Sequence, residues 1–273
     1  MAFKQNSITI NCRKAFYWEK NKQAKETIVL LHGFPGSHEG LLAMASGLGN
    51  YRLIIPDLPA CGLSEQLEGK HNLENYSDWL NSFLKSLNID SVIIVGHSFG
   101  SRVGLVFSSH YPQKVKRLVL ITPVVKVEGL IARFVAVEYE IAKILPAYLR
   151  RSWLSNRVHR NIEKMILYKT ASQKRRHELI AMETKELMHL NPQINIELFD
   201  EFYKFSLVPV GKRVKTKTLV IAGEFDEVAP LDSVQELEKQ LIDSELVIME
   251  KCGHIVVGEK PLTTAKIISK WLE

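Results

Sequence analysis

Short runs of apolar residues recur along the chain, and helical patterns separate most of them. Eight runs of four or five residues are made mostly of Val, Ile, Leu or aromatic residues, which is typical of buried strands. They span residues 8–11, 15–18, 27–31, 52–55, 92–95, 117–121, 218–222 and 245–248. The later runs are continuously apolar, as parallel strands covered on both faces are. The pattern therefore predicts an α/β fold, with a mostly parallel twisted sheet of about eight strands flanked by helices.

Between the runs, apolar residues recur three and four positions apart, which predicts helices at residues 75–87, 231–241 and 262–272. The alternation stops between Pro123 and Lys217, where the pattern is almost wholly helical. The apolar stripes there comprise Leu130, Phe134, Val137, Ile141 and Ile144; Val158, Ile162 and Met165; Leu179, Met182 and Leu187; and Ile196, Phe199 and Tyr203. Most of these residues are expected to pack against one another. We expect a core domain of residues 1–122 and 218–273, with a helical insertion of residues 123–217 after the sixth strand.

Length and composition agree with one globular domain. The chain has 273 residues, 46% of them hydrophobic, which is enough for one large core. The first residues form no apolar signal segment, and no apolar run approaches the roughly 20 residues of a bilayer span, so we expect a cytoplasmic protein. Cys12, Cys61 and Cys252 are an odd and irregularly spaced set. They predict neither a disulfide framework nor a metal site.

Residues 96–100 read Gly-His-Ser-Phe-Gly and lie between the fifth apolar run and a segment, 101–110, that can form a helix. A serine in a sharp turn from strand to helix has a strained backbone, and the flanking glycines allow the close packing that the turn needs. The hydroxyl of Ser98 is then exposed above the helix N-terminus. Because the five residues stand in this context, they predict a nucleophile rather than an ordinary loop.

A serine hydroxyl needs a base, and the base needs an acid to orient it. His254 follows the last predicted strand and is our candidate base. Three carboxylates, Glu224, Asp226 and Glu227, follow the strand at 218–222, at the edge where α/β sheets place functional side chains. Any of the three could be the acid, since a sequence does not show side-chain direction.

The order of serine, acid and histidine, together with these motifs, resembles the α/β-hydrolases that use a serine nucleophile, the branch of esterases and lipases. The resemblance covers nearly the whole chain except its middle, and the spacing of its acid favours Asp226. It implies catalytic roles for Ser98, Asp226 and His254. Residues 32–36, His-Gly-Phe-Pro-Gly, are similar to the family's oxyanion loop. They imply that the backbone N–H groups of Phe34 and Phe99 form the oxyanion hole and that His32 lies at the substrate.

Residues 57–64 resemble a second family loop, Asp-x-Pro-Gly-x-Gly-x-Ser, in which Ala60 stands where glycine is usual. We interpret Asp57 as an organiser of this loop and not as an acid in the reaction. The resemblance also implies that the helical insertion is a cap, or lid, which covers the pocket and selects substrates.

Charge is concentrated in the predicted cap. Residues 126–217 hold 18 basic and 10 acidic residues, while the net charge of the whole chain is +6. Such a cap could attract an anionic substrate or a membrane surface, although solvated helix faces are the simpler interpretation. Basic grooves with interleaved aromatic residues are not evident, so we expect no nucleic acid partner. We expect a small-molecule acyl substrate, no cofactor and no metal, and a monomer or homodimer.

Arg102 follows Ser98 by one helical turn, which would bring it near the pocket floor. An arginine at this position resembles a carboxylate clamp in the menaquinone-pathway branch of the family; it could also form an ion pair in the core. The leading hypothesis is hydrolysis of a carboxylic ester, lactone or thioester through an acyl-enzyme. Two alternatives stay open: cleavage of a C–C or C–O bond in an anionic ketoacid-like substrate, as in meta-cleavage-product hydrolases and menaquinone-pathway synthases, and slow-turnover ligand binding by a receptor of the same fold.

Overall fold

The computed structural model describes residues 2–127, 130–154, 168 and 170–273. The predicted stripe of Val158, Ile162 and Met165 lies outside these residues. All eight predicted strands are present in one sheet. The strands are β1 (Lys4–Ile10), β2 (Arg13–Lys20), β3 (Thr27–Leu31), β4 (Arg52–Pro56), β5 (Val92–His97), β6 (Val115–Ile121), β7 (Thr218–Gly223) and β8 (Ser244–Met249).

The sheet is mostly parallel, as predicted. Its strand order is β1-β2-β4-β3-β5-β6-β7-β8. The pairs β1–β2 and β2–β4 are antiparallel, and the other five are parallel. β1 begins four residues before the predicted run because its polar residues from Lys4 to Ser7 pair with β2 at the edge of the sheet. An edge strand with one solvated face has room for such residues.

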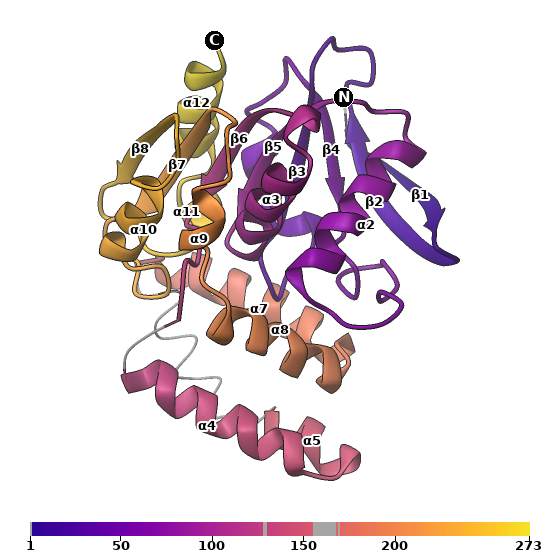
Figure 1. Ribbon diagram of the computed structural model, residues 1–273, viewed down its shortest axis with the longest axis vertical. Helices are drawn as coiled ribbons and strands as arrows, with labels where there is room; N and C mark the ends of the chain where they lie inside the picture. The colour runs from indigo at the N-terminus through magenta and orange to yellow at the C-terminus, as the bar shows by residue number, and fades with distance from the viewer. Residues whose placement is uncertain (1, 128–129, 155–167, 169) are drawn as a thin grey trace.

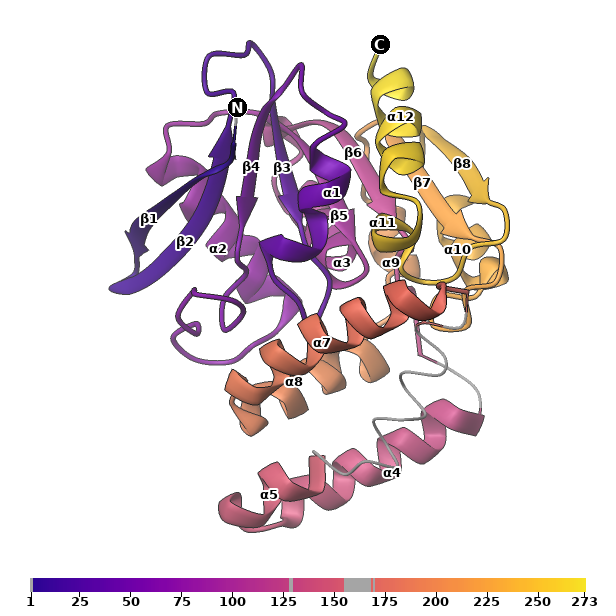
Figure 2. The ribbon, with the colours of Figure 1, turned by 180° about the vertical axis from the view of Figure 1, so that it is seen from behind.

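Helices cover both faces of the sheet (Figures 1 and 2). α2 (Leu73–Ser86), α3 (Phe99–His110) and α10 (Leu231–Glu238) pack on one face around the larger apolar cluster. α1 (Leu42–Ala45), α11 (Val256–Glu259) and α12 (Pro261–Leu272) pack on the other. Two short 3₁₀ turns, η1 (His38–Leu41) and η2 (Pro112–Lys114), complete the core. β3, β5 and β7 are almost wholly buried, and β6 is buried from Leu118 to Ile121, which explains their continuous apolar runs.

Helices also fill the segment between β6 and β7. They are α4 (Leu130–Ile144), α5 (Ala147–Leu154), α7 (Gln173–His189), α8 (Pro192–Lys204) and the short α9 (Val208–Gly211). α7 and α8 lie across the end of the sheet from which the loops after the parallel strands emerge, and α4 and α5 form an outer layer beyond them (Figures 1 and 2). Among the described residues, no helix is both long and apolar enough to cross a bilayer.

The predicted stripe of α4 is partly wrong. Among the described side chains, Tyr139 and Ala142 form a buried apolar cluster with Ile196 of α8. Val137 and Ile144, which were expected to be buried, are 59% and 82% exposed. Helical periodicity shows which residues share a face, but a helix in an outer layer has only one neighbouring layer, and periodicity does not show which of its apolar faces that layer covers.

Candidate active site

Ser98 occupies the turn between β5 and α3, as predicted. Its backbone has φ 52° and ψ −112°, a region that residues other than glycine rarely adopt. Its N–H donates to the carbonyl of Ile121 at 2.9 Å, which anchors the turn to β6. A Cβ on Gly96 would collide with the carbonyl of Gly100, and a Cβ on Gly100 would collide with that of Leu31. The two glycines therefore allow the close approach that this strained turn needs.

The structure brings Ser98, His254 and Asp226 together. Nε2 of His254 lies 2.9 Å from Oγ of Ser98, and Nδ1 of His254 lies 2.8 Å from Oδ2 of Asp226. A carboxylate accepts, so Nδ1 carries the proton and Nε2 is free to accept from the serine hydroxyl. The three residues are only 6%, 2% and 6% exposed, so Ser98 is buried, whereas an exposed hydroxyl was predicted. This chain of hydrogen bonds can move a proton off the serine when it attacks.

Asp226 is also held by its own loop. Its Oδ1 accepts hydrogen bonds of 2.9 Å from the backbone N–H groups of Val228 and Ala229. Of the three candidate acids, Asp226 is the one that the structure places at His254. Glu224 and Glu227 are exposed, and Glu224 instead accepts from the N–H of Lys251 at 2.7 Å.

The two predicted oxyanion residues lie beside the nucleophile. Phe99 is the first residue of α3, so its N–H is among the helical donors that have no partner within the helix. On the other side, a Cβ on Gly33 would lie 3.2 Å from Cβ of Ser98, so the loop that carries Phe34 runs against the serine. The oxyanion role of the two N–H groups remains a prediction that this arrangement allows.

His32 is not placed to bind substrate, contrary to the sequence-based prediction. It is 2% exposed and uses both ring nitrogens within the protein. Nδ1 lies 2.8 Å from the carbonyl of Gly33, and Nε2 accepts from the N–H of Leu58 at 2.9 Å. Burial lowers its pKa, which favours the neutral ring that these bonds require. His32 thus ties the oxyanion loop to the loop after β4.

Arg102 is likewise not a carboxylate clamp in this structure. The side chain is fully buried, and its guanidinium donates to backbone carbonyls at both ends of the inserted helices. The acceptors are Val124, Val125 at 3.4 Å, and Glu201 and Phe205 at 2.7 Å each. Burial lowers its pKa to about 9, which still leaves it a cation at neutral pH. The prediction failed because helical spacing placed the residue correctly but could not show that carbonyls surround its head group.

Asp57 organises its loop, as we interpreted it. One oxygen accepts from the backbone N–H and from Nδ1 of His38, both at 2.9 Å, and the other accepts from the N–H of Leu63 at 2.9 Å. A Cβ on Gly62 would collide with the carboxylate, so this position requires glycine. Ala60 has φ 66°, a left-handed conformation at the position where the family loop usually has glycine.

Aromatic rings surround Phe99, the residue that follows Ser98. The ring of Phe99 lies 5.1 Å from Tyr76, 5.6 Å from Phe202 and 6.2 Å from Phe34, measured between ring centroids. Phe202 belongs to α8, so a helix of the inserted segment packs against the residue next to Ser98.

Carboxylates on α7 and α8 fasten the insertion to the core. Glu186, Glu197 and Glu201 accept hydrogen bonds of 2.8 to 3.1 Å from backbone N–H groups of residues 62, 71 and 73. These contacts were not predicted from the sequence. The only signal was the position of the glutamates on helices, which does not identify a partner more than 120 residues away.

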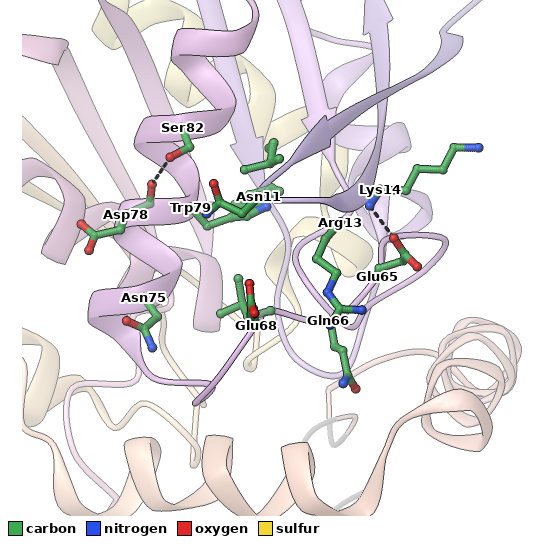
Figure 3. A pocket seen from close by; sticks show the side chains of 12 residues that line it. Asn11, Arg13, Lys14, Glu65, Gln66, Glu68, Asn75, Asp78, Trp79 and Ser82 are labelled. Carbon is green, nitrogen blue, oxygen red and sulfur yellow. Dashed lines mark hydrogen bonds between the residues drawn. The ribbon is translucent and has the colours of Figure 1, made fainter.

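A surface cavity of about 230 Å³ lies elsewhere, between the β1–β2 turn, α2 and residues 65–68 (Figure 3). None of its lining residues belongs to the group around Ser98. Glu65 at its rim accepts from the backbone N–H of Lys14, as the dashed line in Figure 3 shows. In the described part of the chain, no cluster of three or more His, Cys, Asp or Glu residues could hold a metal ion.

Comparison with known proteins gives consistent matches. The family described as alpha/beta hydrolase fold matches residues 26–261. The chain is 24% identical over 264 residues to the monoacylglycerol lipase ABHD6 of Bos taurus, covering 91% of this chain and 75% of the relative. It is 24% identical over 266 residues to 2-hydroxy-6-oxononadienedioate/2-hydroxy-6-oxononatrienedioate hydrolase 1 of Pseudomonas putida, covering 92% and 89%. The crystal structure of MGS-M2, an alpha/beta hydrolase enzyme from a Medee basin deep-sea metagenome library, superposes with a TM-score of 0.82 at 21% identity over 98% of this chain and 97% of that one.

Proposed function

The chain belongs to the alpha/beta hydrolase fold family, and on that premise we propose that it is a serine hydrolase that cleaves carboxylic esters of small to medium acyl groups. Lactones and thioesters undergo the same chemistry and belong to the same proposal. The observation that carries it is the hydrogen-bonded chain from Ser98 through His254 to Asp226. Relatives named as lipases, among them ABHD6, support the ester class.

In the proposed reaction, Oγ of Ser98 attacks the carbonyl carbon of the ester while Nε2 of His254 takes its proton. The carboxylate of Asp226 stabilises the resulting imidazolium and keeps Nδ1 protonated. The C–O bond to the alcohol then breaks, and His254 returns the proton to the leaving oxygen. A water molecule, deprotonated by His254, attacks the acyl-enzyme, which releases the acid and restores Ser98.

The backbone N–H groups of Phe34 and Phe99 are proposed to stabilise the oxyanion of each tetrahedral intermediate. One such fixed donor contributes roughly 3–4 kcal/mol to the transition state. The helical insertion is proposed to act as a cap, because Phe202 of α8 packs beside Phe99 and three glutamates fasten α7 and α8 over the core loops.

We favour neutral substrates because the guanidinium of Arg102 donates to backbone carbonyls and the rings around Phe99, next to Ser98, are apolar. An anionic carboxylate among such rings would lose hydration without gaining a partner. The alternative, C–C bond cleavage in a ketoacid, has its support in the match to the Pseudomonas putida hydrolase.

Fluorophosphonate labelling combined with nitrophenyl ester hydrolysis tests the proposal. The parent protein should be labelled on Ser98 and should hydrolyse nitrophenyl esters, with a maximum at short to medium acyl chains. Ser98→Ala should lose both properties. Ser109→Ala is the matched control, because this serine lies farther along the same helix and its hydroxyl donates to the carbonyl of Val106; it should keep both properties. Labelling that persists in Ser98→Ala would refute the assignment of the nucleophile.

The same assays separate the alternatives. Turnover of a vinylogous ketoacid well above that of any nitrophenyl ester would replace ester hydrolysis with C–C cleavage. Rapid labelling without turnover of either class would instead indicate a ligand-binding protein.

A further inference from the structure

Two buried side chains outside the catalytic group converge on the backbone of the proposed base. Nε2 of His97 lies 3.2 Å from the carbonyl oxygen of His254, and Oγ1 of Thr122 lies 3.0 Å from the same oxygen. We propose that His97 and Thr122 are positioning residues that hold the main chain of His254 at the distance from Ser98 that proton transfer needs. The inference rests on the proposed function, since it concerns the base of that reaction.

The positions of the two donors in the fold explain how they would fix the distance between Ser98 and His254. His97 directly precedes Ser98 in the chain, and Thr122 directly follows β6, whose last residue, Ile121, accepts the N–H of Ser98. The peptide segments that fix the nucleophile therefore also fix the base. Ser98 and His254 are 156 residues apart in the chain, so their 2.9 Å contact depends on such cross-links.

The chemistry of His97 suits a permanent donor. A carbonyl can only accept, so Nε2 of His97 must carry the proton. Burial and the neighbouring His254, whose ring centroid is 5.6 Å away, lower the pKa of His97 to about 3. The ring therefore stays neutral when His254 becomes an imidazolium, and it does not compete for the proton of Ser98.

His97 also meets the oxyanion loop. A Cβ on Gly33 would lie 3.0 Å from Nδ1 of His97, so the imidazole fills the space between that loop and the base. Thr122 is fully buried and has φ 43°, an uncommon conformation for a β-branched residue. Its N–H donates to the carbonyl of Ile221 at 2.7 Å, which fixes the hydroxyl between β6 and β7.

Paired substitutions separate positioning from folding. Thr122→Val removes the hydroxyl at nearly constant shape, and Thr122→Ser keeps it. We expect Thr122→Val to lower kcat about 3- to 10-fold with KM nearly unchanged, the effect of one neutral hydrogen bond, and Thr122→Ser to remain close to the parent. His97→Leu should lower kcat at least as much, and His97→Gln, which keeps an N–H donor, should restore part of it.

The double variant gives the sharper test. Thr122→Val combined with His97→Leu should lower kcat by about 10- to 100-fold, at least the product of the single losses, because the carbonyl of His254 then keeps neither bond. Fluorophosphonate labelling rates should fall in parallel, because they depend on the same proton transfer.

Thermal unfolding of each variant is measured alongside. A lower melting temperature with unchanged kcat and labelling rate in the folded protein would show a purely structural role and overturn the inference. If Ser98→Ala is inactive in that case, the proposed function still holds. Full activity in Ser98→Ala would instead refute the proposed function itself.

Discussion

The guanidinium of Arg102 donates a 2.7 Å hydrogen bond to the backbone carbonyl of Phe205 and so joins α3, the helix that follows Ser98, to the end of α8. The same head group also donates to Val124, at the start of the insertion. One side chain on α3 therefore holds both ends of the segment that leaves the core after β6 and returns to it before β7. The insertion and the helix below Ser98 are in this way mechanically connected.

Replacing Arg102 by Met should destabilise the protein. The variant leaves several buried carbonyls without donors, which we expect to lower the free energy of unfolding by roughly 2–5 kcal/mol in urea titrations. Activity should fall to a similar extent on neutral and anionic esters, since the substitution displaces the inserted helices and removes no contact with a substrate carboxylate. Arg102→Lys, which keeps the charge but not the planar set of donors, serves as the control and should be intermediate. A stable Met variant with a selective loss on anionic esters would reinstate the carboxylate clamp.

Substitution of the acid should be severe and specific. Asp226→Asn should keep the fold and lower kcat by about 10⁴-fold, because the amide favours the wrong tautomer of His254 and cannot stabilise its charge. Glu224→Gln and Glu227→Gln, in the same loop, should stay within about 3-fold of the parent, because neither side chain is placed at His254. Steady-state kinetics on one nitrophenyl ester measures these losses. If Glu224→Gln or Glu227→Gln lowers kcat more than Asp226→Asn does, the acid is the glutamate that was replaced.

The fold and the position of Ser98 could be predicted from sequence because their signals are local. A buried parallel strand has to be apolar throughout, and a serine at a strained turn needs glycines around it, so β5 and residues 96–100 support the same prediction. The positions of His254 and of the three candidate acids follow from the strands that precede them. The choice of Asp226 among those acids came from the resemblance to the family and not from a local constraint.

Contacts between distant segments could not be predicted in this way. Arg102 was correctly placed below Ser98, but the carbonyls around it come from residues 22 to 103 positions away. His97 and Thr122 look like ordinary neighbours of a motif and a strand until the fold brings the carbonyl of His254 between them. Val137 and Ile144 show the same limit for helices. The sequence predicts that they share an apolar face of α4, but it does not predict whether a neighbouring layer covers that face.

Ala60 offers a test of backbone strain. Its φ of 66° costs an alanine roughly 1–2 kcal/mol, whereas glycine adopts this conformation freely but loses more entropy on folding. Ala60→Gly should therefore raise the free energy of unfolding by about 0.5 kcal/mol. Ala24→Gly is the matched control, in a loop where φ is not positive, and should lower the stability by roughly 0.5–1 kcal/mol. Equal losses in both variants would show that Ala60 is not strained.

Buried neutral histidines predict a loss of stability in mild acid. Burial lowers the pKa of His71 to about 4 and, with His254, that of His97 to about 3. The unfolded chain binds protons at these sites near pH 6.5, before the folded protein does, so the free energy of unfolding falls as the pH drops from 7 towards 4.

Carboxylates with lowered pKa values, such as Asp57 and Asp200, lose their contribution only below about pH 3.8, the unperturbed value. Glu259, whose pKa burial raises, acts in the opposite direction near pH 4.5 and above. The window from pH 6.5 to 5 therefore reports mainly on the histidines.

Urea titrations at pH 7, 6 and 5 should show a decrease in the free energy of unfolding of about 2 kcal/mol per buried histidine between pH 7 and pH 5. His71→Gln should remove the decrease that His71 contributes and flatten the profile, while His110→Gln, at an exposed position, should leave the profile unchanged. A profile that is flat in the parent protein would mean that these imidazoles are already accessible to protons in the folded state.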